Sequence, residues 1–274
     1  MTMEGSSRQG WAAVLEALTP LENDPAIDLR AVAGELYAVA ETLAGNPRLA
    51  RALGDKSRDA WPKRELVRRV LGAHVSPVAM GVVEAAVSER WRIERDLTHA
   101  LERAGHDLVL SAAQHEGNLD QVERELLAAQ QLFSADEGLR DALHRIDVPA
   151  EAKAELVTKL LAGKALPDSV WLAQRPLLNQ RGRRYAAVIW QILSQAARLR
   201  DKVTAHVTSA TPLSDEQVAR LAAGLTKLYG YEIFVDATVD PDLVGGLLVK
   251  VGDEVIDATV DRRLAEAGRV LSKV

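Results

Sequence analysis

The stretch DPDLVGGLLVKVGDEVID, from Asp240 to Asp257, decides how the end of the chain folds. Its glycines and lysine are the materials of a phosphate-binding loop, but a P-loop needs four residues between its first two glycines, followed by Gly-Lys-Ser/Thr. Neither spacing is present, because Lys250 stands between two valines. Apolar residues alternate instead on both sides of Gly252-Asp253, which predicts two strands, 247–251 and 254–257, joined by a tight hairpin turn.

The residues before this hairpin have the pattern of a small α+β domain. Val203, Ala205 and Val207 alternate with polar residues, which predicts a strand. Ser214 and Gln217 then have the spacing of a capping box, which predicts the start of a helix. After this helix, alternation resumes at residues 231–235. The apolar stripe expected to be buried on the helix is Val218, Leu221, Ala222, Leu225 and Leu228.

Residues 29–71 and 119–161 are similar to one another at a constant offset of 90. Fourteen of the 43 aligned positions are identical, among them Glu35 and Glu125, and Lys63 and Lys153. By chance, a chain of this Ala- and Leu-rich composition would match at roughly a tenth of its positions. The similarity therefore indicates a duplication.

Each copy has the apolar periodicity and the proline breaks of a bundle of short helices. In the second copy, Leu119, Val122, Leu126 and Ala129 keep to one helical face, and prolines break the chain at positions 149 and 167. The first copy has its breaks at prolines 47 and 77. The predicted fold is therefore mainly α with a C-terminal α+β domain: two tandem helical bundles followed by a small mixed sheet with helices. We expect a front copy at residues 1–104, a second copy at 105–200 and a C-terminal domain at 201–274.

Composition excludes several classes of protein. The net charge of −5 and the pI near 5.8 argue against a nucleic-acid-binding protein, which usually has a basic balance. The absence of cysteine removes disulfides, thiolate metal sites and cysteine nucleophiles. The chain shows neither the apolar core of a signal peptide nor an apolar run of about 20 residues that would cross a bilayer. We expect a cytoplasmic protein that reaches a membrane only through partners.

The tail combines three motifs in order: VTSATPLS at 207–214, VDPDLVGG at 239–246, and VGD with ID at 251–257. This ordered set closely resembles the delta subunit of bacterial F-type ATP synthase, a family that includes the mitochondrial oligomycin sensitivity-conferring protein. The resemblance covers about residues 105–274. Family members have one helical bundle before the α/β domain, so the front copy is an addition, similar to the long delta subunits of actinobacteria.

The resemblance implies a non-catalytic subunit of the peripheral stalk, or stator, in ATP synthesis and proton transport. Such a subunit links the alpha/beta catalytic head to the b subunit, so that the head resists rotational torque. The implied partners are the N-terminal helices of the alpha subunits and the C-terminal region of b. We expect a single copy in a hetero-oligomeric complex, peripheral to the cytoplasmic face of the cell membrane.

In the family, the alpha helix binds between the first and fifth helices of the bundle. In the second copy, the residues whose spacing would let them line one such groove are Leu108 and Ala112 on the first helix, with Val170, Trp171 and Gln174 on the fifth. The front copy has residues 79–83 at the equivalent place, without a tryptophan, so we expect weaker alpha binding there or a different use. For the b subunit, Leu247 and Val249 on one side of the hairpin are the predicted contact.

No enzyme motif competes with this interpretation. The six histidines show no metal-site spacing, and no Gly-x-Ser-x-Gly elbow is present, so we expect no catalytic residues, no cofactor and no metal. Residues 181–184, RGRR, are interpreted as a solvated turn, and residues 63–69 as a charged helix face. The five tryptophans are expected to pack in the bundles, with Trp171 as the candidate binding anchor. The alternative function is a stand-alone helical scaffold with other partners.

Overall fold

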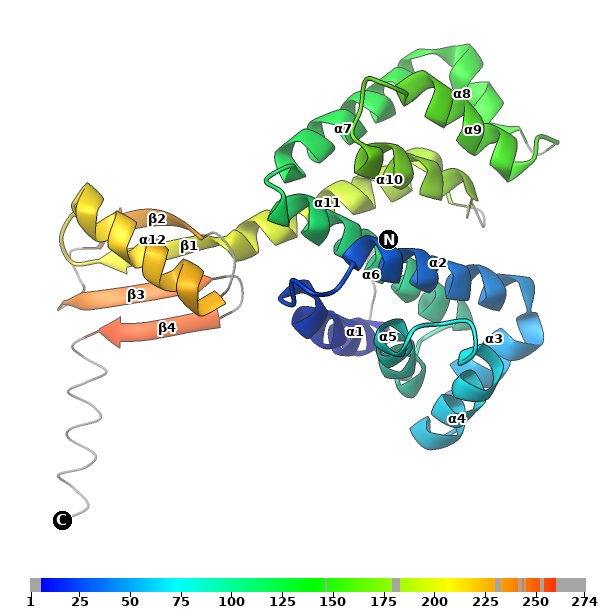
Figure 1. Cartoon of the computed structure of the whole chain (residues 1–274), viewed down its shortest axis with the longest axis horizontal. Helices are drawn as coiled ribbons and strands as arrows, with labels where there is room; N and C mark the ends of the chain where they lie inside the picture. Colours follow the sequence, from blue (N-terminus) through cyan, green and yellow to red (C-terminus); the bar gives the residue numbers. More distant parts are fainter. Residues whose placement is uncertain are drawn as a thin grey trace. The chain divides into compact units, whose positions relative to one another are not determined.

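The computed structural model describes residues 6–145, 147–178, 183–229, 233–240, 243, 245–251 and 254–259. Within these residues there are twelve helices and four strands, all four strands in one sheet near the C-terminus (Figure 1). The predicted fold class, mainly α with a C-terminal α+β domain, is confirmed. The chain divides into two compact units, Met1–Ala196 and Ala197–Val274.

The first unit consists of short helices separated by turns. The front copy contributes α1 (Ser6–Glu22), α2 (Leu29–Gly45), α3 (Pro47–Gly54), α4 (Ala60–Leu71) and α5 (Pro77–Ser88). The long helix α6 (Glu94–His115) follows. The second copy continues with α7 (Leu119–Ala135), α8 (Glu137–His144), α9 (Ala150–Leu161) and α10 (Pro167–Leu178), and α11 (Tyr185–Val203) contains the boundary between the units.

The duplication predicted from the sequence is present in the helices and in their contacts. The bounds of α2 to α5 recur in α7 to α10 at an offset of 90 residues. Glu35 accepts a hydrogen bond from the backbone N–H of Ser76 at 2.8 Å, and Glu125 accepts one from Leu166 at the same distance. Each carboxylate ties the second helix of its copy to the turn before the fifth, so both copies contain the same charge-assisted tertiary bond.

Helix α6 is shared by the two copies. It contacts α1, α2, α3 and α5 of the front copy as well as α7 and α10 of the second, and it lies between the two groups of helices (Figure 1). The expected boundary between residues 104 and 105 falls inside this continuous helix. All residues from Asp96 to Ala113 except Arg103 are buried, as expected for a helix covered on all sides.

The second unit has a mixed sheet of order β2-β1-β3-β4, formed by β1 (Thr204–Ser209), β2 (Phe234–Val239), β3 (Gly246–Val251) and β4 (Glu254–Thr259). Strands β1 and β2 are parallel, and the other pairs are antiparallel. Val251 pairs with Glu254, which leaves two residues for the predicted hairpin turn; that turn lies outside the described residues.

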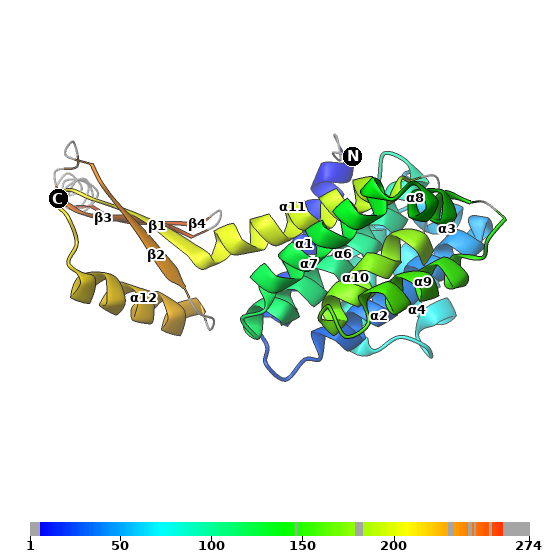
Figure 2. The same cartoon turned by 90° about the horizontal axis from the view of Figure 1, so that it is seen from above.

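Helix α12 (Asp215–Tyr229) covers one face of this sheet (Figure 2). The predicted capping box is confirmed, because Gln217 accepts from the backbone of Ser214 at 2.8 Å and the Ser214 hydroxyl accepts in return at 3.3 Å. Leu225 is buried in the core with Ala205 and Val207. The prediction that Leu228 belongs to the buried stripe is wrong: its side chain is 68% exposed, in the last turn of the helix.

Candidate partner-binding surfaces

The five residues predicted to bind an alpha helix lie on α6 and α10, but they do not form one exposed surface. Leu108 and Ala112 on α6 are buried. Val170, Trp171 and Gln174 on α10 are half-buried. The Gln174 amide turns toward α9, where it donates to the Thr158 hydroxyl. The structure thus leaves part of α10 accessible at this place and covers the two α6 residues.

Tyr37 of the front copy is inserted between α6 and α10. Its ring is 5.0 Å from the Trp171 ring, edge to face, and 5.5 Å from the His106 ring. The Arg175 guanidinium lies 3.9 Å from the centroid of Trp171 and 4.8 Å from that of Tyr37. These ring distances and the cation above both rings are favourable geometries. We call this meeting of three helices the α2–α6–α10 junction.

Gly105 is what allows α2 to approach α6 so closely. A Cβ atom at this position would lie 2.6 Å from the Tyr37 ring and 3.3 Å from the carbonyl oxygen of Ala33. Any larger residue would therefore push α2 and its tyrosine away from α6. The Tyr37 side chain is 2% exposed, and among the described residues its hydroxyl has no hydrogen-bond partner. Burial raises the pKa of Tyr37, so the ring stays neutral.

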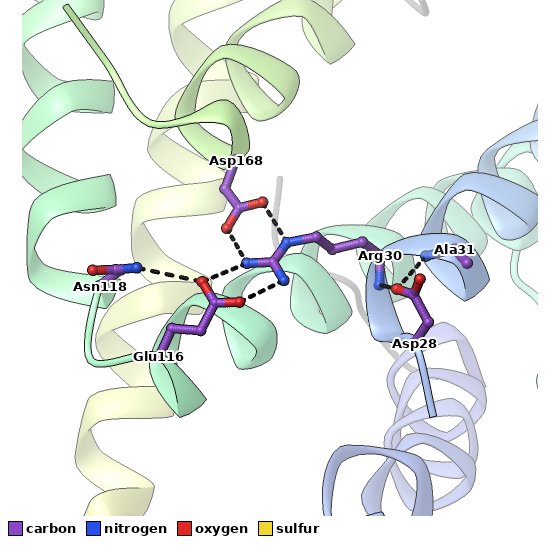
Figure 3. Close-up of polar contacts among 6 residues, drawn as sticks. All are labelled: Asp28, Arg30, Ala31, Glu116, Asn118 and Asp168. Carbon is purple, nitrogen blue, oxygen red and sulfur yellow. Dashed lines mark hydrogen bonds and ion pairs between the residues drawn. The ribbon is translucent and has the colours of Figure 1, made fainter. Parts of the chain in front are cut away.

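An arginine clamp holds the N-terminal end of α2 to the second copy (Figure 3). Arg30 donates from Nε and Nη2 to Asp168 at 2.7 and 2.8 Å, and from Nη1 and Nη2 to Glu116 at 2.8 and 2.9 Å. Asp168 is in the first turn of α10, and Glu116 caps the end of α6. One guanidinium therefore joins three helices through paired hydrogen bonds to each carboxylate, the geometry that arginine favours.

The clamp joins one positive group to two negative groups. The hydrogen bonds to Asp168 and then to Glu116 raise the pKa of Arg30, and the bond from Arg30 lowers the pKa of Glu116. The N-cap of α2 fixes the backbone at the arginine, because the Asp28 side chain accepts hydrogen bonds from the N–H groups of Arg30 and Ala31. A carboxylate at the C-terminal end of α6 is unfavourable for the helix dipole, and the arginine offsets that cost.

Buried polar groups of α6 connect this region to the residues before and within α11. Arg183 pairs with Glu102, so this residue departs from the predicted solvated turn, whereas Arg184 is exposed as expected. Residues 181 and 182 lie outside the described residues. Gln195 donates to Asp107 at 2.7 Å, and its Oε1 atom lies 3.3 Å from His106 Nδ1. Burial lowers the pKa of His106 to about 3, so this imidazole is neutral at physiological pH.

Other expected surface and core assignments need correction. Lys63 is buried and donates to the Glu89 carbonyl at 3.3 Å, so residues 63–69 are not a simple charged face. Trp11 and Trp91 pack in the core as predicted, whereas Trp61 and Trp190 are exposed. The described residues contain no group of three His, Asp or Glu side chains placed to hold a metal.

The two residues predicted to bind b, Leu247 and Val249, face α12. Val249 is buried in the core of the second unit, and Leu247 packs against that core. The opposite face of the sheet has no described helix on it and exposes Phe234 and Val255. On this face the strands also carry a polar cross-strand pair, His206 and Asp236, at 3.2 Å. Among the described residues, this face thus exposes two large apolar side chains, one on each outer strand of the sheet.

Comparison with known proteins decides the family. A model described as ATP synthase delta (OSCP) subunit matches residues 108–271. The chain belongs to the ATP synthase delta (OSCP) subunit family. It is 40% identical over 267 residues to the ATP synthase subunit delta of Streptomyces griseus, covering 97% of this chain and 98% of the relative. It is also 40% identical over 268 residues to that of Kineococcus radiotolerans, covering 98% and 97%.

Membership of the delta (OSCP) family identifies the chain as a non-catalytic, structural protein of ATP synthesis and proton transport. The match to the family model begins within α6, whereas the matches to the two relatives extend through the front copy. The front copy is thus shared with those relatives. Among the described helices, none combines the length and the apolar character needed to cross a membrane.

Proposed function

We propose that the chain is a peripheral-stalk subunit of F-type ATP synthase that ties the alpha/beta catalytic head to the b subunit. The observation that carries the proposal is the 40% identity, over nearly the whole of both chains, to proteins named ATP synthase subunit delta. The two compact units suit a connector, because each has its own core and its own surface for a partner. One copy serves each complex, at the cytoplasmic side of the membrane and bound there through its partners.

The alpha contact is proposed for the helical unit. In the second copy, Val170, Trp171 and Gln174 are the half-buried part of the predicted set, and Trp171 contacts Tyr37. Leu108 and Ala112 are buried. The front copy offers the same face of α5, where a side chain at position 81 would meet open space. An N-terminal helix of an alpha subunit would bind the α5 face directly, through apolar anchors spaced along one side, and the α10 face only at the residues that α2 leaves accessible.

The b contact is proposed for the second unit. A helix end from b would lie on the exposed sheet face at Phe234 and Val255. Leu247 and Val249 would act indirectly, by packing in the core on the α12 side of the sheet. Burial of two large apolar side chains there would supply binding energy without disturbing the core. A charge introduced at Val249 would instead be desolvated inside the unit and would act through loss of folding.

A bridging experiment tests this function. The purified chain is mixed with the alpha/beta head and with the soluble part of b, and the complexes are separated by size. We expect the chain to bring head and b together, and a head without its alpha N-terminal segments to be left out. Phe234→Asp should remove b but keep the head. A chain that binds neither component would overturn the proposal.

A further inference from the structure

The fifth helices of the two copies differ along one face. At an offset of 90 residues, Val78, Gly81 and Ala85 of α5 correspond to Asp168, Trp171 and Arg175 of α10. In α10 each of these three side chains contacts α2: Asp168 through Arg30, and Trp171 and Arg175 through Tyr37. The second copy therefore uses this helix face for contacts within the chain, whereas a Cβ at Gly81 in the front copy would meet open space.

The second copy has no equivalent of Tyr37 or of Arg30. The counterpart of Tyr37 in the second copy is Leu127, and the counterpart of Arg30 is Asp120. A leucine offers no aromatic ring to a tryptophan or a guanidinium, and an aspartate would repel a carboxylate instead of pairing with it. Tyr37 and Arg30 are thus specific features of the front copy's second helix, and both reach the same partner helix from positions seven residues apart on one face of α2.

We propose that Tyr37 is a built-in occupant of the place between α6 and α10, held there by the Arg30 clamp, and that it excludes a partner helix from this part of the second copy. The proposal rests on the proposed function for the identity of the excluded helix, an alpha N-terminal segment. The position of Tyr37 does not depend on the proposed function. Its ring is enclosed by Gly105, His106, Trp171 and Arg175.

The consequence concerns access. A partner helix lying between α6 and α10 would need to bury its own anchor against Trp171 and Leu108. The Trp171 ring already contacts Tyr37, and Leu108 is fully buried. Binding there requires Tyr37 to leave and the two carboxylates of the clamp to lose their cation. The accessible alternative in the same chain is the α5 face at Gly81.

The first arm of the test asks whether the place is a site for an aromatic ring. Tyr37→Ala removes the ring, and Tyr37→Phe is the matched control that keeps it. We expect millimolar p-cresol, the tyrosine side chain as a free molecule, to raise the melting temperature of Tyr37→Ala but not that of wild type or Tyr37→Phe. Should Tyr37→Ala fail to fold, Tyr37→Val takes its place. No p-cresol effect on a folded variant overturns the proposal.

The second arm uses a synthetic alpha N-terminal peptide and titration calorimetry on the full chain. We expect Tyr37→Ala to bind one more peptide than Tyr37→Phe, or to bind it about tenfold tighter, with p-cresol as a competitor. Equal binding by both variants, with no competition, overturns the exclusion. If no form binds the peptide, the proposed alpha contact falls, while the p-cresol arm still decides whether Tyr37 occupies an aromatic site.

Discussion

The front copy and the second copy have the same helices at a constant spacing, yet their fifth helices have opposite characters. At three corresponding positions α5 has Val78, Gly81 and Ala85, whereas α10 has Asp168, Trp171 and Arg175, which contact α2. The carboxylate contacts of Glu35 and Glu125 are the same in both copies. Duplication has therefore kept what folds each bundle, and the copies differ where one touches the other.

The largest effect is expected where α2 meets α6. Gly105→Ala places a methyl group 2.6 Å from a ring that is enclosed by its neighbours, and it should cost about 1–3 kcal/mol of unfolding free energy. Urea unfolding followed by circular dichroism measures this. The control is Gly34→Ala on α2, where a Cβ meets open space and helix propensity should stabilise the fold slightly. Equal results for both variants would show that the close approach is unimportant.

The Arg30 clamp should have the next largest effect. Arg30→Ala leaves Asp168, which is 7% exposed, without its cation, and we expect a loss of about 1–2 kcal/mol, reduced by salt because the arginine itself is partly exposed. The control Arg145→Ala removes an exposed ion pair with Asp147 and should change stability less. Denaturant melts at two salt concentrations test the pair. A salt-independent loss would contradict an electrostatic clamp.

A smaller effect is the pH dependence of this clamp. The pKa of Glu116 is lowered in the folded chain by the bond from Arg30, so the unfolded chain binds protons more readily. Stability from this group is present above its ordinary pKa of 4.5 and is lost as the pH falls through the lower folded value. The stability difference between wild type and Arg30→Ala should therefore shrink below about pH 4.5. If the stability difference between the two proteins grew as the pH fell, the Arg30–Glu116 bond would not be the cause of the pH dependence.

The smallest effect is expected for the Tyr37 hydroxyl. Because this buried group has no hydrogen-bond partner among the described residues, Tyr37→Phe should be neutral or should stabilise by up to about 1 kcal/mol. Thermal melts of the two proteins compare them directly. A clear loss of stability on removing the hydroxyl would mean that it makes a bond, and the packing role of the ring would then be only part of its contribution.

Local patterns predicted much of this fold from the sequence. The offset of 90 residues, the prolines that start α5 and α10, and the Ser214–Gln217 capping box all depend on residues close together in the chain, and the structure contains each of them. The two strands of the hairpin were also predicted, because alternation depends on neighbours alone.

Long-range contacts were not predictable in the same way. Nothing local to Tyr37 indicates that its ring meets Trp171, 134 positions later. The sequence around an aromatic residue on a helix does not indicate which distant side chain packs against it. Lys63 was assigned to a charged surface for a similar reason: the charge suggests solvent, and the burial depends on neighbouring helices. The family groove expected at Leu108 and Trp171 could not reveal that α2 of the front copy packs against it.

A double-mutant cycle between Tyr37 and Trp171 tests most directly whether the front copy packs against the second copy through these two rings. The unfolding free energies of Tyr37→Leu, Trp171→Leu and the double variant are measured in urea and compared with wild type. If Tyr37 occupies the α2–α6–α10 junction, the two changes should be coupled by about 1 kcal/mol. Strictly additive losses would show that the rings do not interact, and that the two copies are not joined through this contact.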